Sequence, residues 1–170
     1  ASFASEGLYE KPSAYIRHLI SQLPENKKLT RRQTLFLVKF SQACDEAWED
    51  EDKPPEQRRI HHMILLGGGG TGKTHVVQKL VFKAVEYIWP NESSESLSML
   101  VVASSNAQAK NISTAQWKAR TLHNAACMRV QEMVNPKMRP GDKADVLERL
   151  WRNVRVLVIE EVSMVSAPNY

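Results

Sequence analysis

Residues 63–74 read MILLGGGGTGKT, a short apolar run followed at once by a glycine-rich stretch. The second part, residues 67–74, fits the spacing GxxxxGK[ST], in which a strand leads into a loop and the loop into a helix. Residues 74–89 supply the helix, because their apolar residues recur every three or four positions until Pro90. The pattern therefore has the flanking elements that it needs.

A loop of this kind is suited to holding phosphate. Glycines let the backbone curl so that several N–H groups point at phosphate oxygens, and the helix N-terminus adds a partial positive charge. Lys73 would reach the β- and γ-phosphates, and the Thr74 hydroxyl would hold Mg²⁺. The expected nucleotide-binding residues are Gly67, Gly68, Gly69, Gly70, Thr71, Gly72, Lys73, Thr74 and His75. A flexible glycine linker that precedes Lys73 by chance is the alternative interpretation.

Two further apolar runs have the length of a strand, at residues 99–102 and 154–159. Like residues 63–66, they are continuous rather than alternating, which is typical of strands buried on both faces of a parallel sheet. Helical patterns lie between the runs. Strands that alternate with helices predict an α/β fold with helices on both faces of a mainly parallel sheet.

The first sixty residues predict helices. Residues 12–23 form a short helical pattern, and Thr30 is a suitable N-cap for a longer helix. The apolar face of that longer helix would carry Phe36, Phe40, Ala43, Ala47 and Trp48. An acidic stretch with two prolines then ends the pattern. We expect a helical N-terminal segment at residues 1–59 and a nucleotide-binding domain at residues 60–170.

Composition narrows the class of protein. Apolar residues make up 42% of the chain and charged residues 25%, as in ordinary globular proteins. Residues 107–155 hold ten Lys or Arg and four Asp or Glu, a local balance of +6 that permits a polyanionic partner. Cys44 and Cys127 are far apart, which predicts neither a disulfide scaffold nor a metal site. The cysteine usage therefore favours a reducing, intracellular environment. No apolar run approaches the roughly 20 residues of a membrane helix, so we expect no membrane partner.

The third apolar run ends in two glutamates, Glu160 and Glu161. A parallel strand delivers its last residues to the carboxyl edge of the sheet, where ligands of open α/β sheets bind. Glu160 would hold Mg²⁺ together with Thr74, and Glu161 would polarise the attacking water as a general base. The common arrangement has Asp at the first position. Two solvated glutamates that end a strand are the alternative interpretation.

Several motifs now line up along the chain. They are LTRRQ at residues 29–33, the phosphate loop, ASSNAQAKNI at residues 103–112, TLH at residues 121–123 and EEVSMV at residues 160–165. Taken in order, they resemble the superfamily 1 DNA helicases of the petite-integration-frequency (PIF) type, which are relatives of the RecD helicases. The similarity covers roughly residues 29–166, the first motor domain of such an enzyme. It implies a RecA-like P-loop NTPase fold, a three-layer sandwich, with ATP and Mg²⁺ as ligands.

The resemblance also implies roles by position. Gln33 matches the glutamine that reads the adenine base, while Lys73 and Glu161 match catalytic positions and Glu160 a magnesium position. Contacts to single-stranded DNA are implied for Ser105, Asn106, Lys110, Asn111, Thr121 and His123. The chain departs from the family at residues 103–106, ASSN in place of APTG, and in the longer segment 113–120.

Three residues of the longer segment are candidates for contacts with DNA. They are Trp117, which would stack on bases, and the cations Lys118 and Arg120, which would neutralise phosphates. An ordinary surface loop with two cations is the alternative interpretation.

We expect the parent protein to be an ATP-dependent DNA helicase, of 5'-3' polarity and with nuclear or mitochondrial roles in DNA maintenance if eukaryotic, by resemblance. A second RecA-like domain is an expected partner and is not found in these residues. We therefore expect an incomplete domain from a longer protein, which binds ATP weakly and does not unwind DNA by itself. The alternatives are another P-loop ATPase that acts on DNA, and a truncated, inactive helicase remnant.

Overall fold

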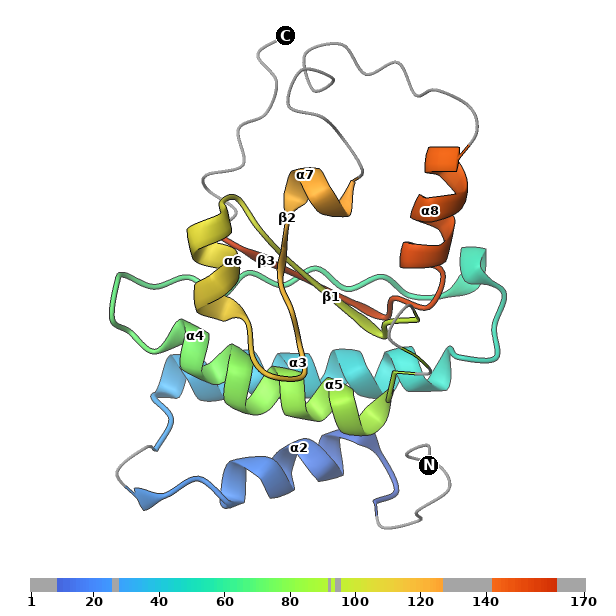
Figure 1. Cartoon of the computed structure of the whole chain (residues 1–170). Coiled ribbons are helices and arrows are strands. Elements are labelled where there is room, and N and C mark those ends of the chain that lie inside the picture. Colours follow the sequence, from blue (N-terminus) through green and yellow to red (C-terminus); the bar gives the residue numbers. More distant parts are fainter. Residues whose placement is uncertain (1–8, 26–27, 92, 94–95, 127–141, 162–170) are drawn as a thin grey trace, which may run out of the picture. The chain divides into compact units, whose positions relative to one another are not determined.

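The chain divides into two compact units, Ala1–Ile88 and Trp89–Tyr170. The computed structural model describes residues 9–25, 28–91, 93, 96–126 and 142–161 (Figure 1). The domain boundary expected near residue 60 stays a prediction.

The first unit is helical in its described residues. Its elements are α2 (Pro12–Ser21), α3 (Arg31–Glu49), the 3₁₀ turn η2 (Pro55–Gln57), and a continuous helical stretch made of α4 (Lys73–Val76), the π-helical turn η3 (Val77–Val81) and α5 (Phe82–Ile88). Helix α2 packs against α3 and against α5, as Figure 1 shows. The two helices expected before residue 50 and the one expected after the glycine-rich loop are therefore confirmed.

Helix α3 begins with a capping box. Thr30 Oγ1 accepts a hydrogen bond from the Gln33 backbone N–H at 3.3 Å, and Gln33 Oε1 accepts one from the Thr30 N–H at 2.8 Å. The box satisfies two backbone donors that the start of a helix leaves without partners. Thr30 is thus confirmed as the N-cap. Of the expected apolar face, Phe40 is buried and the other four residues are half-buried, while α3 also buries Leu37, Ser41 and Cys44.

The stretch from α4 to α5 carries much of the buried apolar surface of the first unit. The five residues expected on its apolar face are all buried: Val77, Leu80, Val81, Ala84 and Ile88. Val76, Phe82 and Val85 are buried too. The expected stripe is therefore confirmed, and it is broader than a single helical face.

The second unit contains a parallel sheet. Its elements are β1 (Met99–Ala103), α6 (Asn106–Ile112), β2 (Arg120–Thr121), α7 (Leu122–Ala125), α8 (Asp142–Trp151) and β3 (Val156–Glu160). The strand order is β2-β1-β3, with β1 in the centre (Figure 1). The observed α/β class and the parallel sheet agree with the prediction. The three-layer RecA-like arrangement stays a prediction.

The central strand and two helices enclose a small core in this unit. Leu100 and Val102 of β1 pack with Ala125 of α7 and Leu150 of α8. The indole of Trp151 closes one side, and its Nε1 donates to the Ala125 carbonyl at 3.3 Å. All five residues of β1 are buried, which is the pattern expected for a central parallel strand.

Two of the three expected strands differ from the prediction. Residues 63–66 are not a strand in the described part of the chain, and Ile64 is 71% and Leu66 80% exposed. A strand is defined by a hydrogen-bonded neighbour, and the described sheet contains only β1, β2 and β3. The third run forms β3 but is not buried on both faces, because Leu157 and Ile159 are exposed.

Candidate functional site

The glycine-rich loop turns into helix α4 through left-handed backbone. Gly70 has a φ of 73° and Gly72 a φ of 79°, a region in which side chains are strained and glycine is not. Gly72 is the N-cap of α4. The sequence needs glycine at these two positions because the chain must reverse direction sharply before the helix begins.

The Lys73 side chain folds back onto the loop. Its Nζ donates to the Gly67 carbonyl at 2.6 Å and to the Gly68 carbonyl at 3.0 Å. The Thr71 hydroxyl donates to the same Gly68 carbonyl at 2.8 Å. The ammonium charge that a phosphate group would require is therefore already held at the loop by carbonyl oxygens, which an anion can replace.

Gln33 connects the start of α3 to this loop. Its Nε2 donates to the Thr71 carbonyl at 3.1 Å, across 38 positions of sequence. A Cβ atom at Gly72 would lie 3.1 Å from the same Nε2. The structure thus brings Gln33, the glycine-rich loop and Lys73 together, and Thr74 and His75 follow directly in α4.

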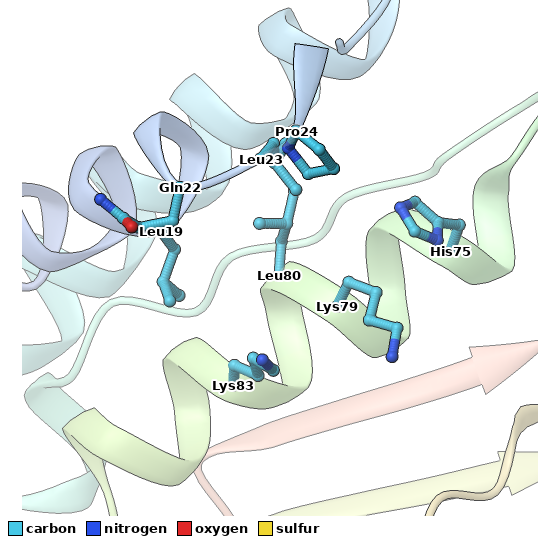
Figure 2. Close-up of a pocket in the computed structure, with 8 residues that line it drawn as sticks. All are labelled: Leu19, Gln22, Leu23, Pro24, His75, Lys79, Leu80 and Lys83. Atoms are coloured by element: carbon cyan, nitrogen blue, oxygen red, sulfur yellow. The ribbon is translucent and has the colours of Figure 1, made fainter. Parts of the chain in front are cut away.

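A pocket of about 220 Å³ lies beside the start of the helix that follows the loop (Figure 2). It is lined by Leu19, Gln22, Leu23, Pro24, His75, Lys79, Leu80 and Lys83. Its cationic and imidazole side chains, His75, Lys79 and Lys83, are spaced by four residues and so share one face of the helix. An apolar lining beside such a face can hold a planar or anionic group.

His75 is the predicted site residue that contributes to the pocket. Its Nε2 is buried and has no hydrogen-bond partner within the described residues. A buried ring nitrogen without a partner is costly. The rest of the pocket was missed by sequence reasoning. Only the spacing of His75, Lys79 and Lys83 could have indicated it.

The two acidic residues lie at the end of β3, in the second unit. Glu160 is the last residue of the strand and is half-buried. Glu161 is exposed and has a φ of 54°, the one positive value outside glycine in the described residues. Left-handed backbone at a residue other than glycine often marks a functional position, where the surrounding fold maintains it.

The sheet register aligns the ends of all three strands. Ala103 of β1 pairs with Thr121 of β2 on one side and with Glu160 of β3 on the other. Because the strands are parallel, the residues that follow each of them lie along one carboxyl edge. The segments expected to contact DNA, which follow β1 and β2, therefore lie on the same edge of the sheet as the acidic pair.

Two of the predicted DNA contacts have a clear local role. Ser105 Oγ accepts from the Gln108 N–H at 3.3 Å and caps α6, and Thr121 Oγ1 accepts from the Asn124 N–H at 3.3 Å and caps α7. The remaining four are exposed or half-exposed: Asn106, Lys110, Asn111 and His123. Their contacts with DNA stay predictions.

The longer loop before β2 does not present an aromatic side chain. Trp117 is 3% exposed, and its backbone closes a tight turn with Thr114 through two hydrogen bonds of 2.9 and 3.0 Å. The proposal that Trp117 stacks on DNA was therefore wrong, because its ring belongs to the core. Lys118 and Arg120 are exposed, as expected.

The described residues contain neither a candidate metal site nor a candidate membrane span. No group of three or more His, Cys, Asp or Glu side chains is arranged to hold a metal ion. None of the described helices is long and apolar enough to cross a membrane.

Comparison with protein families identifies the domain. A family model described as an AAA domain matches residues 56–170, more than half of the 170 residues. Comparisons with curated proteins and with solved structures found no match. The matched range contains the phosphate loop, the sheet and the acidic pair. The chain therefore belongs to the AAA domain family, and its phosphate loop is that of a P-loop NTPase-type domain.

Proposed function

We propose that this chain is the ATP-binding part of an ATP-dependent DNA helicase of superfamily 1. The observation that carries the proposal is the arrangement of Lys73 and Gln33 around one glycine-rich loop at the start of a helix. The family match supports nucleotide binding and hydrolysis. The helicase assignment rests on the resemblance of the motifs in the sequence.

ATP would enter by replacing contacts that the loop now makes with itself. The phosphates take the place of the Gly67 and Gly68 carbonyls as partners of Lys73 Nζ. Loop N–H groups and the helix N-terminus hold the phosphate oxygens. The base would lie beside Gln33, whose side-chain amide keeps one N–H and one lone pair for adenine besides its bonds to Thr30 and Thr71.

Magnesium and the acidic pair would complete the chemistry. Mg²⁺ prefers oxygen ligands and keeps several waters, and the Thr74 hydroxyl and the Glu160 carboxylate are donors of that kind. Glu161 would accept the proton of the water that attacks the γ-phosphorus, with ADP as the leaving group. A second RecA-like domain would supply an arginine finger. We therefore expect the 170-residue chain to bind ATP with little turnover and without unwinding DNA.

Single-stranded DNA would lie along the carboxyl edge of the sheet in the second unit. The segments after β1 and β2 line this edge, and Lys110, Lys118 and Arg120 are exposed in the same unit. Contacts of this kind are mainly with phosphates, so binding should weaken steeply with salt. Fluorescence anisotropy with a labelled oligothymidine, repeated over a salt series, measures that dependence.

Calorimetric titration with ATP, with and without Mg²⁺, tests the nucleotide site. We expect Lys73→Ala to weaken ATP binding about 10- to 100-fold, because a charge-assisted contact contributes about 1.5–3 kcal/mol. Lys39→Ala, which removes an exposed lysine of α3, is the matched control and should bind like the wild type. Equal affinity in the wild type and in Lys73→Ala would contradict the proposal.

A different P-loop ATPase acting on DNA is the second candidate. It is favoured by the family match, whose description is the broader AAA domain. The two candidates differ in what the protein that contains this chain does to duplex DNA. A helicase separates a duplex with a single-stranded overhang in the presence of ATP, whereas an ATPase of another kind hydrolyses ATP and leaves the strands paired.

A further inference from the structure

Helix α3 contacts the loop-bearing segment at both of its ends. At the N-terminal end, Gln33 Nε2 donates to the Thr71 carbonyl. At the C-terminal end, the C-cap residue Asp50 binds Arg59. Residues 60–66, which lead into the phosphate loop, run between these two contacts. The same helix thus touches the segment on both sides of its extended part.

Asp50 is the centre of the contact at the C-terminal end. Its side chain is 1% exposed and accepts hydrogen bonds from Arg59 Nε and Nη2, both at 2.8 Å, and from the Arg59 backbone N–H at 2.9 Å. Lys53 Nζ donates to Oδ1 at 2.7 Å. The Arg59 and Lys53 hydrogen bonds hold the pKa of Asp50 well below its usual range. The buried carboxylate is therefore ionised and fully paired.

Arg59 binds more of the helix end than Asp50 alone. Its Nη2 donates to the Glu46 carbonyl at 3.1 Å and to Glu49 Oε2 at 3.2 Å, and its Nη1 lies 3.2 Å from Glu46 Oε2. His61 Nε2 lies 3.4 Å from the same Glu46 oxygen. A planar guanidinium with several partners fixes its backbone more strongly than a single ion pair does.

Packing does not explain how the segment between the contacts is held. Ile60, Ile64 and Leu66 are all more than 70% exposed. From Gln33 to Asp50 the helix rises about 26 Å at about 1.5 Å per residue, and the twelve residue-to-residue steps from Arg59 to Thr71 reach at most about 40 Å. The contacts of Gln33 with Thr71 and of Asp50 with Arg59 therefore fix both ends of the segment, and they restrict the positions that its residues can take.

We propose that α3 is a brace for the phosphate loop, with Asp50 and Arg59 as positioning residues that never touch the nucleotide. The proposal rests on the proposed nucleotide site and adds a second set of residues on which its affinity depends. When Arg59 loses its contact with Asp50, one end of the segment is no longer fixed and the unbound loop becomes less ordered. The loop must then be ordered when ATP binds. That ordering lowers affinity without removing a contact to the ligand.

The test compares Asp50→Asn and Arg59→Ala with Glu49→Gln, which alters an exposed partner of the same arginine. We expect the first two to bind ATP about 5- to 20-fold more weakly in calorimetry, a size typical of coupling between sites. Arg59→Lys keeps the charge but not the forked contact, so it should lie between them and the wild type. Glu49→Gln should bind like the wild type.

Two further measurements separate positioning from general damage. Helix content by circular dichroism, taken well below the unfolding temperature, should match the wild type in each variant. Hydrogen–deuterium exchange should rise in residues 60–71 of Asp50→Asn and stay unchanged in α2. If Asp50→Asn does not fold, Arg59→Lys carries the same comparison, with a smaller rise in exchange expected.

The outcomes distinguish the brace from the site that it serves. Folded Asp50→Asn and Arg59→Ala with wild-type affinity for ATP would overturn the brace and leave the nucleotide site intact. If the wild type does not bind ATP, the proposed function fails. In that case, hydrogen–deuterium exchange in residues 60–71 still tests whether α3 positions the loop. Unchanged exchange in Asp50→Asn and Arg59→Ala would overturn the brace as well.

Discussion

Two apolar runs that look alike in the sequence differ in the structure in secondary structure and in burial. Residues 99–103 form β1, with all five side chains buried. Residues 63–66 are equally apolar and precede the phosphate loop, yet they form no strand and their side chains are largely exposed. One run pairs with a strand on each side, and the other has no paired neighbour in the described residues. Apolar composition permits a strand, whereas a hydrogen-bonded neighbour makes one.

The largest expected effect comes from truncating one leucine in each run. Leu100→Ala should destabilise the protein by about 2–5 kcal/mol, because the side chain is 1% exposed and leaves a cavity. Leu66→Ala should change the stability by less than about 0.5 kcal/mol, since Leu66 is 80% exposed. Urea unfolding followed by tryptophan fluorescence measures both. Similar losses in the two variants would show that residues 63–66 are buried as well.

A smaller effect is expected from the glycines that follow the exposed run. Gly72→Ala places a side chain in left-handed backbone, with its Cβ 3.1 Å from Gln33 Nε2, and should cost about 1–3 kcal/mol. Gly69→Ala is the matched control, because nothing lies within 4 Å of its added Cβ. The melting temperatures of the two variants in thermal unfolding measure the difference in their stability. Equal melting temperatures would mean that the loop does not need its left-handed turn.

Loss of the α3 cap should have a still smaller effect. Thr30→Ala removes the oxygen that accepts from the Gln33 N–H, and an N-cap of this kind contributes about 1 kcal/mol. Thr30→Ser keeps the hydroxyl and serves as the control. Urea midpoints should therefore fall in the first variant and be nearly unchanged in the second. A wild-type midpoint in Thr30→Ala would show that the capping box adds nothing.

The stabilisation by Asp50 should depend on pH only in the acid range, and it should be constant near neutral pH. The folded-state pKa of Asp50 is lowered, chiefly by its hydrogen bonds to Arg59. Its contribution is therefore complete above the unfolded-state pKa of about 3.9 and is lost as the pH falls below that value. The stability difference between the wild type and Asp50→Asn should be constant from about pH 5 to 8 and shrink below about pH 4. A constant difference down to pH 2 would contradict the ionised pair.

Local features of the fold were predictable from the sequence. The helix after the loop and its buried stripe follow from a period of about 3.6 residues. The cap at Thr30 follows from the preference for threonine at the residue that precedes a helix. The phosphate loop follows from GxxxxGK[ST], because that chemistry depends on backbone conformation that glycines encode directly.

Long-range features were not predictable, for a common physical reason. The Gln33 contact with Thr71 spans 38 positions, and the burial of Trp117 depends on the fold around its turn. The two residues of β2 are too few to show any periodicity. Each of these features is decided by which segments meet in three dimensions, and a single sequence carries no direct signal for that.

Hydrogen–deuterium exchange of residues 67–76, with and without MgATP, tests the central claim most directly. The claim predicts slower exchange in this stretch on addition of MgATP, because loop N–H groups become bonded to phosphate. Adenosine, which lacks phosphate, should give little protection there. Lys73→Ala should reduce the protection. Unchanged exchange at saturating MgATP, or equal protection by adenosine, would contradict a phosphate-binding role for this loop.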